Sequence, residues 1–155
     1  MFKRFGALSV AIAVVALAVG VAIPAAASSR AAHEHPTIRV VAIITELSLV
    51  DVGDKGPSLG DEIVFSSNLL QDGNQVGHQG AVCTTVSLER QEAQCIATYS
   101  FSGGQITGRA LVILGSKAAY DVSITGGSGT YEGAEGEVHV QPVSDTEGIL
   151  TFDVD

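Results

Sequence analysis

The chain has no tryptophan, a single methionine, and eight Lys or Arg residues against seventeen Asp or Glu residues. Its formal net charge is -9, and loss of Lys3 and Arg4 with an N-terminal segment would make the charge about -11. Such an acidic protein repels nucleic-acid phosphates and anionic lipid headgroups. We therefore expect neither nucleic acid nor a membrane surface as a partner of the mature protein.

The sequence has only one long apolar run, over residues 5–23, and it directly follows two basic residues. Ala25 and Ala27 come next, with the small-residue spacing of a signal-peptide cleavage site. We predict a secretory signal peptide at 1–27, a flexible polar leader at 28–36, and an extracellular location. A retained membrane anchor is the alternative, although the apolar run is short for a bilayer span.

Cysteine is scarce, with Cys83 and Cys95 as the two examples. Secretion would bring both into an oxidising compartment, where a disulfide is the default expectation. They lie at similar distances on either side of an expected turn at 89–92, so they could face each other across neighbouring antiparallel strands. The alternative is a reactive thiol at Cys83, which requires a thiolate and an activating neighbour.

No window after residue 36 shows the apolar stripe of an amphipathic helix. Apolar residues are instead dense, or alternate with polar ones, in short segments separated by turn residues, a pattern typical of strands. Asp-Gly-Asn at 72–74, for example, is typical of a hairpin turn. The segments that we interpret as strands are 38–50, 62–70, 76–88, 95–101, 105–114, 120–125, 137–143 and 149–154.

About eight strands joined by short turns favour a meandering antiparallel sheet closed on itself. We therefore predict one all-β domain over residues 37–155, an eight-stranded antiparallel barrel. A barrel of this strand number has an interior that is filled by side chains or holds one small ligand. A two-sheet sandwich is the alternative, because counting strands does not distinguish closure from stacking.

Motifs that carry catalysis or bind cofactors are few. No serine has the flanking residues of a nucleophile elbow. Asp51, Asp54 and Asp61 lack the spacing of an EF-hand calcium loop, and the His-Glu-His run at 33–35 has no third strong metal ligand nearby. We expect no metal and no other cofactor.

Glycine, by contrast, is abundant, and it is dense over residues 126–136. The simplest interpretation is a tight connection between strands. A phosphate-binding loop is disfavoured, because alternating polar and apolar residues follow the run instead of a helix. Thr-Gly-Gly-Ser-Gly at 125–129 resembles the signature loop shared by plant allene oxide cyclases and dirigent proteins.

Other segments resemble allene oxide cyclases in the same order along the chain. Leu-Gly-Asp at 59–61, with the Phe-Ser pair at 65–66, is similar to that family's Leu-Gly-Asp and Pro-Phe-Ser segment. Gly-Ala-Val-Cys at 80–83 is similar to its Gly-Leu-Cys strand, and Tyr-Ser-Phe at 99–101 and Thr-Phe at 151–152 also match. The shared order runs through nearly the whole mature domain.

The resemblance implies a calycin-like eight-stranded barrel with one apolar cavity, commonly arranged as a homotrimer. It also implies candidate site residues. The catalytic candidates are Glu46, Asp51, Ser67 and Asn68, and the pocket candidates are Phe65, Cys83 and Tyr99.

Two departures separate this chain from the plant proteins. Leu49 falls where allene oxide cyclases carry a glutamate, so charge stabilisation is lost unless Glu46 supplies it. Glu135 falls where dirigent proteins carry an arginine, which reverses the local charge. We therefore do not expect either plant reaction.

The predicted function is a secreted barrel that binds a small hydrophobic molecule and steers its cyclisation or isomerisation by conformational restriction and exclusion of water. A non-catalytic carrier of a lipophilic ligand is one alternative. A filled barrel with a structural role in the cell envelope is another. Chemistry is favoured if the strand faces with Glu46, Ser67 and Tyr99 point into an open cavity, and an all-apolar cavity favours carriage.

Overall fold

The computed structural model describes residues 37–53 and 55–155, so the predicted signal peptide and leader lie outside the described residues. The secondary structure of the described part consists of strands. They are β1 (Ile38–Val50), β2 (Glu62–Gln71), β3 (Asn74–Ser87), β4 (Glu92–Phe101), β5 (Gly104–Ile113), β6 (Tyr120–Gly129), β7 (Gly136–Pro142) and β8 (Glu147–Val154). Among these residues no helix has the length and apolar character needed to cross a membrane.

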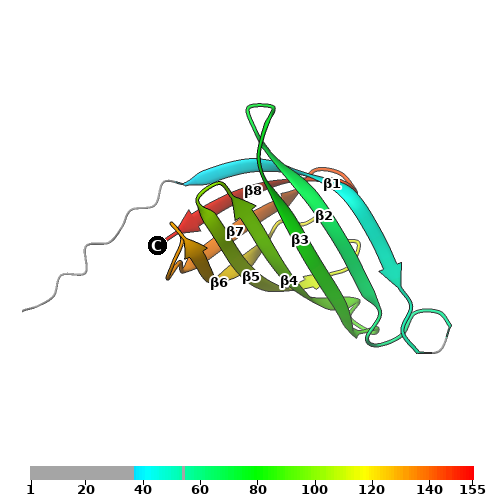
Figure 1. The fold of residues 1–155 in the computed structure, drawn as a ribbon. Coiled ribbons are helices and arrows are strands. Elements are labelled where there is room, and N and C mark those ends of the chain that lie inside the picture. The colour runs from blue at the N-terminus through cyan, green and yellow to red at the C-terminus, as the bar shows by residue number, and fades with distance from the viewer. Residues whose placement is uncertain (1–36, 54) are drawn as a thin grey trace, which may run out of the picture. The chain divides into compact units, whose positions relative to one another are not determined.

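Each strand pairs antiparallel with its neighbour in sequence, and β8 pairs with β1, so the sheet closes into a barrel (Figure 1). The predicted eight-stranded antiparallel barrel is confirmed, and the sandwich alternative is wrong. One end of the barrel, which we call the loop end, carries the connections 51–61, 88–91, 114–119 and 143–146. The opposite, hairpin end carries the connections 72–73, 102–103 and 130–135.

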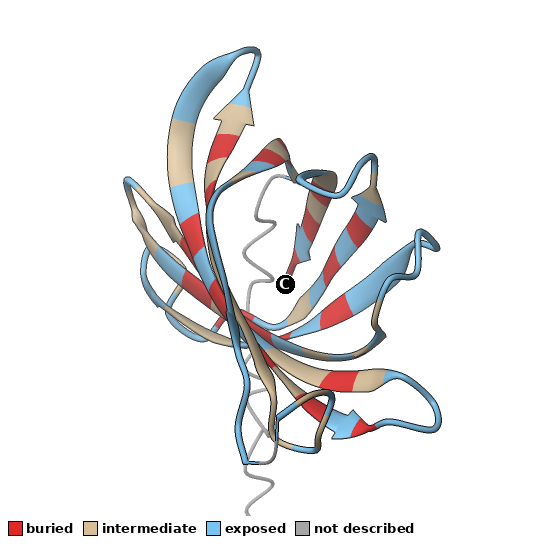
Figure 2. Ribbon diagram, turned by 90° about the vertical axis from the view of Figure 1, so that its right-hand side faces the viewer, coloured by how far each residue is buried: buried red, intermediate tan, exposed pale blue. Residues whose placement is uncertain are grey.

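Buried and exposed residues alternate along the strands, because successive side chains point into and out of the barrel (Figure 2). Near the hairpin end the interior is filled by large side chains such as Leu69, Ile106 and Phe152, which are fully buried. Tyr99 packs edge-on against Phe152, with ring centroids 4.9 Å apart. Burying a side chain of this size contributes about 1.5–3 kcal/mol to stability.

The interior wall formed by β3, β4 and β5 is built from small residues toward the loop end. Cross-strand partners in this wall include Ala81 with Ala97, and Ala97 with Gly108. A Cβ atom at Gly108 would come within 2.7 Å of Val122 Cγ1, so the small residues let β6 pack closely against this wall.

A β-bulge in β1 changes which of its residues face inward. Ile44 lies opposite Ser67 of β2, but the next paired residue, Glu46, lies opposite Ser66. An extra residue in one strand reverses the alternation beyond it. Consequently Ile44 faces the interior, Glu46 faces outward, and Leu47 takes the inward position opposite Phe65.

The glycine-dense segment is strand over residues 126–129 and forms the connection to β7 over residues 130–135, so the predicted connection after residue 125 begins four residues later than expected. β6 continues to Gly129, where it pairs with Gly104 of β5. At Gly127 a Cβ atom would come within 2.2 Å of the Tyr131 carbonyl oxygen. Glycine lets β6 pass close under the turn at 130–135, and so it closes the hairpin end.

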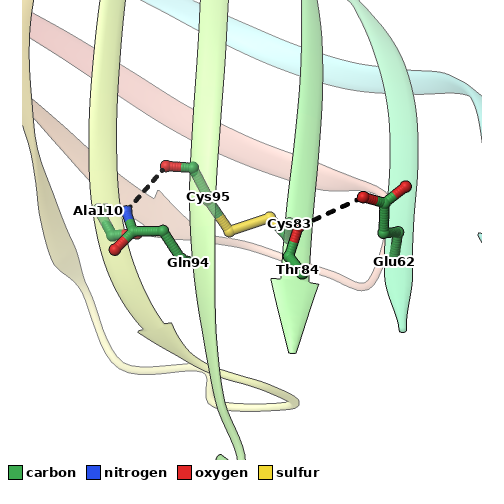
Figure 3. Close-up of a disulfide and its surroundings, with 6 residues drawn as sticks. All are labelled: Glu62, Cys83, Thr84, Gln94, Cys95 and Ala110. Carbon is green, nitrogen blue, oxygen red and sulfur yellow. Dashed lines mark hydrogen bonds between the residues drawn. A yellow bond between two sulfur atoms is a disulfide. The ribbon is translucent and has the colours of Figure 1, made fainter. Parts of the chain in front are cut away.

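A disulfide between the two cysteines links β3 to β4. Cys83 lies directly opposite Cys95, their sulfur atoms are bonded, and their Cα atoms are 4.0 Å apart (Figure 3). The disulfide expected from the sequence is therefore present in the structure, and no free cysteine remains. The alternative of a reactive thiol at Cys83 is not compatible with this bond.

Candidate functional site

An interior cavity of about 140 Å³ extends from the middle of the barrel to the β7–β8 connection at the loop end. Its apolar walls include Phe65, Val140 and Leu150. Among the polar side chains that line it, Ser67, Gln79 and Tyr99 are buried. This volume is sufficient for several water molecules or a small polar end of a ligand.

The three polar residues form one row across three neighbouring strands. Ser67 of β2 lies opposite Gln79 of β3, and Gln79 lies opposite Tyr99 of β4. They are 2%, 8% and 1% exposed, respectively. Cross-strand partners in a sheet point to the same face, so the row projects its polar groups together into the cavity.

None of these three side chains forms a hydrogen bond with another described residue, although burying a polar group without a partner is costly. No fully enclosed side-chain polar atom of the described residues lacks a partner. The polar groups of Ser67, Gln79 and Tyr99 therefore open onto the cavity. They can hydrogen-bond to a molecule placed there.

The Tyr99 hydroxyl stays protonated at neutral pH. Burial, and to a lesser degree the nearby Tyr120 hydroxyl, raise the pKa of Tyr99 well above its usual range. Burial also raises the pKa of Tyr120, which lines the same cavity. The row thus presents neutral hydrogen-bond donors and acceptors, which can orient a carbonyl, ether or hydroxyl oxygen and stabilise negative charge that develops on it.

A second cavity, of about 520 Å³, lies at the loop end, and we call it the mouth cavity. Its volume is within the range of small-molecule sites. Inward-facing Leu49 and Ile63 contribute apolar walls, and Thr85 lines the cavity from β3. Residues of the 51–61 loop, Asp51 among them, form its rim.

The Asp61 carboxylate holds the 51–61 loop in shape. It accepts hydrogen bonds from the Val52 amide at 2.9 Å and from the Ser58 amide and hydroxyl at 2.7 and 2.9 Å. The bonds from Val52 and then Ser58 lower the pKa of Asp61, so it is ionised at neutral pH. The Thr85 amide donates to the Asp61 carbonyl at 2.8 Å, which fastens this loop to β3.

Four of the predicted site residues line a cavity. Phe65, Ser67 and Tyr99 line the interior cavity, and Asp51 lines the mouth cavity. Cys83 lines neither cavity: its cross-strand neighbour Ile63 faces the mouth cavity, and its sulfur is bonded to Cys95.

Two predicted site residues lie away from both cavities. Glu46 is exposed on the outer face of β1, with the Ser66 hydroxyl 3.5 Å from its carboxylate. Asn68 also faces outward, and its side-chain oxygen accepts a hydrogen bond from Gln75 at 3.1 Å. The bulge explains the position of Glu46, and Asn68 follows Ser67 directly in a regular strand.

Gln79, Tyr120 and Thr85 also line the cavities but were not among the site residues predicted from the sequence. A polar residue among alternating small residues on β3 was the available signal for Gln79, but Val82 and Val86 also make the opposite face of this strand apolar. Sequence alternation alone therefore did not distinguish the two faces of β3. Among the described residues, no group of three or more His, Cys, Asp or Glu side chains is arranged to hold a metal ion.

Glu135 lies far along the barrel from both cavities. It belongs to the connection between β6 and β7 at the hairpin end, where its amide and carbonyl pair with Asp155. The cavities are lined from the loop end. The carboxylate of Glu135 therefore lines neither cavity.

Comparison with solved structures finds barrels of several activities. A pyocyanin demethylase is 30% identical in sequence, with a TM-score of 0.65, and the match covers 76% of this chain and 100% of that chain. A pterocarpan synthase dirigent protein is 18% identical, with a TM-score of 0.59 and coverage of 77% and 87%. The Diels–Alderase AbmU from Streptomyces koyangensis is 15% identical, with a TM-score of 0.59 and coverage of 76% and 64%. The last two show the shared fold.

A comparison with curated protein sequences gives no match. A family model, in contrast, matches residues 41–152, which include most of the barrel from β1 to β8. The family is described as the allene oxide cyclase barrel like domain. The order of sequence motifs, the closed eight-stranded barrel and this match agree, and the chain belongs to the allene oxide cyclase-like barrel family.

Proposed function

We propose that this protein binds a small hydrophobic molecule inside the barrel and steers its cyclisation or isomerisation. The observation that carries the proposal is the row of Ser67, Gln79 and Tyr99, three buried polar side chains without partners among the described residues, which open onto one cavity beside the apolar side chains of Phe65, Val140 and Leu150. Such an arrangement leaves hydrogen-bonding capacity unused until a ligand arrives. It suits a molecule with an apolar body and one neutral oxygen function.

The chemistry that these residues support is orientation and electrostatic assistance. Tyr99 stays protonated, so it acts as a hydrogen-bond donor and not as a base. Rate acceleration would come from holding a flexible substrate in a reactive shape, away from water, while the row stabilises charge developing on the substrate oxygen. Intramolecular cyclisations and isomerisations benefit most from this combination.

Carriage without reaction is the second candidate. The carboxylates that line the interior cavity lie at its loop end: Asp145 belongs to the β7–β8 connection, and Glu147 is the first residue of β8. The buried part therefore holds no carboxylate or imidazole for proton transfer among the described lining residues. This lining offers no general base for a reaction at the centre of the cavity. Retention of an intact ligand needs no such base.

To test this proposal, the purified protein is incubated with extracellular lipophilic extracts, and the retained and released molecules are identified by mass spectrometry. The proposal expects a molecule retained at one per barrel, with retention reduced in a Ser67→Ala/Tyr99→Phe double variant. A new isomer in the wild-type sample assigns an enzyme, and retention of unchanged molecule assigns a carrier. Stoichiometric retention that is equal in both proteins would contradict the proposed site.

We also propose that the protein is secreted after cleavage of residues 1–27. A disulfide between Cys83 and Cys95 supports this location, because such bonds persist in oxidising compartments. Mass spectrometry of the N-terminus of protein recovered from culture medium tests it. Recovery only from cells, with residues 1–27 retained, would contradict it.

A homotrimer is proposed for the assembly. Val64, Val82 and Ile96 are successive cross-strand partners on the outer face of the barrel, and Val82 and Ile96 are 37% and 48% exposed. An apolar row of this kind on an outer face is typical of an association surface. Sedimentation equilibrium of the wild type and of a Val82→Glu variant tests it, with a trimer expected for the wild type and a monomer for the variant.

A further inference from the structure

The charged residues that line the two cavities all have the same sign. Asp51, Asp61 and Glu62 line the mouth cavity, and Asp145 and Glu147 line the interior cavity. Among the described lining residues of both cavities there is no Lys, Arg or His. The charged residues among the described lining residues of the two cavities are therefore all acidic.

These carboxylates differ in how far the protein itself satisfies them. The Asp61 carboxylate accepts three hydrogen bonds from its own loop. Glu62 has the Thr84 hydroxyl 3.5 Å away, and Asp145 pairs with Lys117. Asp51 accepts one bond, from the Gly56 amide at 3.1 Å to Oδ2, and its Oδ1 has no hydrogen-bond partner among the described residues. Asp51 and Glu62 thus each keep one carboxylate oxygen without a hydrogen-bond partner among the described residues, and Asp51 is the one that belongs to the rim loop.

The positive residues of the adjoining loops, Lys55 and Arg90, do not line the mouth cavity. Lys55 belongs to the 51–61 loop. Arg90, in the neighbouring connection, bonds through Nε to Glu92 at 2.7 Å. The negative charge at the mouth is therefore not cancelled by a protein cation among the described lining residues.

A further polar side chain points into the mouth cavity from its buried wall. Thr85 is 9% exposed and lines the cavity, and its hydroxyl has no hydrogen-bond partner among the described residues. Leu49, Ile63 and Leu88 form apolar walls beside it. The mouth cavity therefore combines apolar surface, one free hydroxyl and an acidic rim.

From this arrangement we infer that the mouth cavity selects lipophilic molecules that carry a positive charge, such as an aryl or alkyl ammonium, and rejects anionic ones such as fatty-acid carboxylates. The inference rests on the proposed function, whose substrate class it narrows. The cation would lie beside Asp51, with the apolar body against Leu49 and Ile63. An anion would lose its hydration and meet only carboxylates.

Three fluorescent probes with one ring system test the selection: 1-naphthylmethyl-trimethylammonium, 1-naphthalenemethanol and 1-naphthoate. We expect their affinity for the purified protein to fall in that order. The advantage of the cation over the alcohol should shrink as salt is raised, because salt screens partly exposed charges. This measurement requires no variant and is therefore independent of any folding defect.

The matched variants are Asp51→Asn and Asp153→Asn. The amide oxygen of the first keeps an acceptor for the Gly56 amide, and Asp153 is exposed on β8 outside both cavities. Asp51→Asn should weaken binding of the cationic probe about two- to fivefold and leave the alcohol unchanged. Asp153→Asn should change neither.

Three results would overturn the inference. The first is equal or tighter binding of naphthoate, and the second is a cation preference that Asp51→Asn and Asp153→Asn reduce equally. The third is that the cationic probe binds no more tightly than the alcohol, while binding of the alcohol depends on Ser67 and Tyr99. This third result would contradict the charge selection but not the proposed function. Absence of one-per-barrel binding for all three probes, together with no retained molecule from lipophilic extracts, would remove both.

Discussion

Gln79 of β3 lies directly opposite Tyr99 of β4, and neither side chain forms a hydrogen bond with another described residue although both are buried. Structural polar residues in a barrel interior normally satisfy one another. A facing pair that does not is therefore better explained by a ligand than by stability. Substitutions should therefore distinguish residues that bind a ligand from residues that stabilise the barrel.

Removing the Tyr99 hydroxyl should affect ligand binding and not folding. In Tyr99→Phe the ring still packs against Phe152, and the lost hydroxyl has no protein partner. We expect unfolding free energy to change by less than about 1 kcal/mol, while ligand retention falls about tenfold, as for loss of a buried hydrogen bond. Urea unfolding and ligand titration measure the two effects. Ser123→Ala, on an exposed β6 position, is the control, and a large loss of stability in Tyr99→Phe would indicate a structural hydroxyl.

Alkaline pH should destabilise the protein through Tyr99. Its pKa is raised in the folded state, so the folded protein keeps this proton where the unfolded chain releases it. The stabilisation is complete below the unfolded pKa of about 10 and decreases above it, by up to about 1.4 kcal/mol per pH unit for one group. Unfolding measured between pH 9 and 12 should show this decline, and the decline should be shallower in Tyr99→Phe. Equal slopes in both proteins would contradict the assignment.

The disulfide should stabilise the barrel without taking part in ligand binding. Cys83 and Cys95 are separated by 12 residues, for which loop-closure entropy gives about 3 kcal/mol. Reduction should lower the unfolding free energy by about this amount, and the same reductant should have no effect on a Cys83→Ala/Cys95→Ala variant. Loss of ligand affinity in a reduced but folded protein would show that the bond also shapes the cavity.

Two glycines provide a matched test of the hairpin end. A Cβ at Gly127 would meet the Tyr131 carbonyl oxygen at 2.2 Å, whereas a Cβ at Gly80 would have no atom within 4 Å. Gly127→Ala should cost about 1–3 kcal/mol by overpacking. Gly80→Ala should be neutral or stabilise by about 0.5 kcal/mol, since alanine restricts the unfolded chain more than glycine does. Equal urea midpoints for the two variants would refute this interpretation of the segment.

Glu46 and Asn68 should be dispensable for the ligand. Both face outward, where Glu46 lies near Ser66 and Asn68 accepts a bond from Gln75. Glu46→Gln and Asn68→Ala should leave ligand affinity within about twofold of the wild type, because surface substitutions of this kind have small effects. A tenfold loss in Glu46→Gln would mean that the β1 bulge rearranges when ligand binds.

The sequence by itself determined the strands, the antiparallel order and the family. Alternating residues and turn residues specify a strand locally, and the ordered motifs from Leu59 to Phe152 are visible without coordinates. The pairing of Cys83 with Cys95 was also within reach, because equal spacing about one turn places two residues opposite each other. These features depend on near neighbours along the chain.

Only the tertiary structure decided which side chains share a cavity. A single extra residue in β1 turned Glu46 outward and Leu47 inward, and the apolar run before Thr45 does not show from the sequence alone which of its residues face inward. The row of Ser67, Gln79 and Tyr99 arises from the registers of two separate ladders. Barrel closure and strand register are set by contacts between segments far apart in sequence, and those contacts bring the polar row and the acidic mouth together at one end.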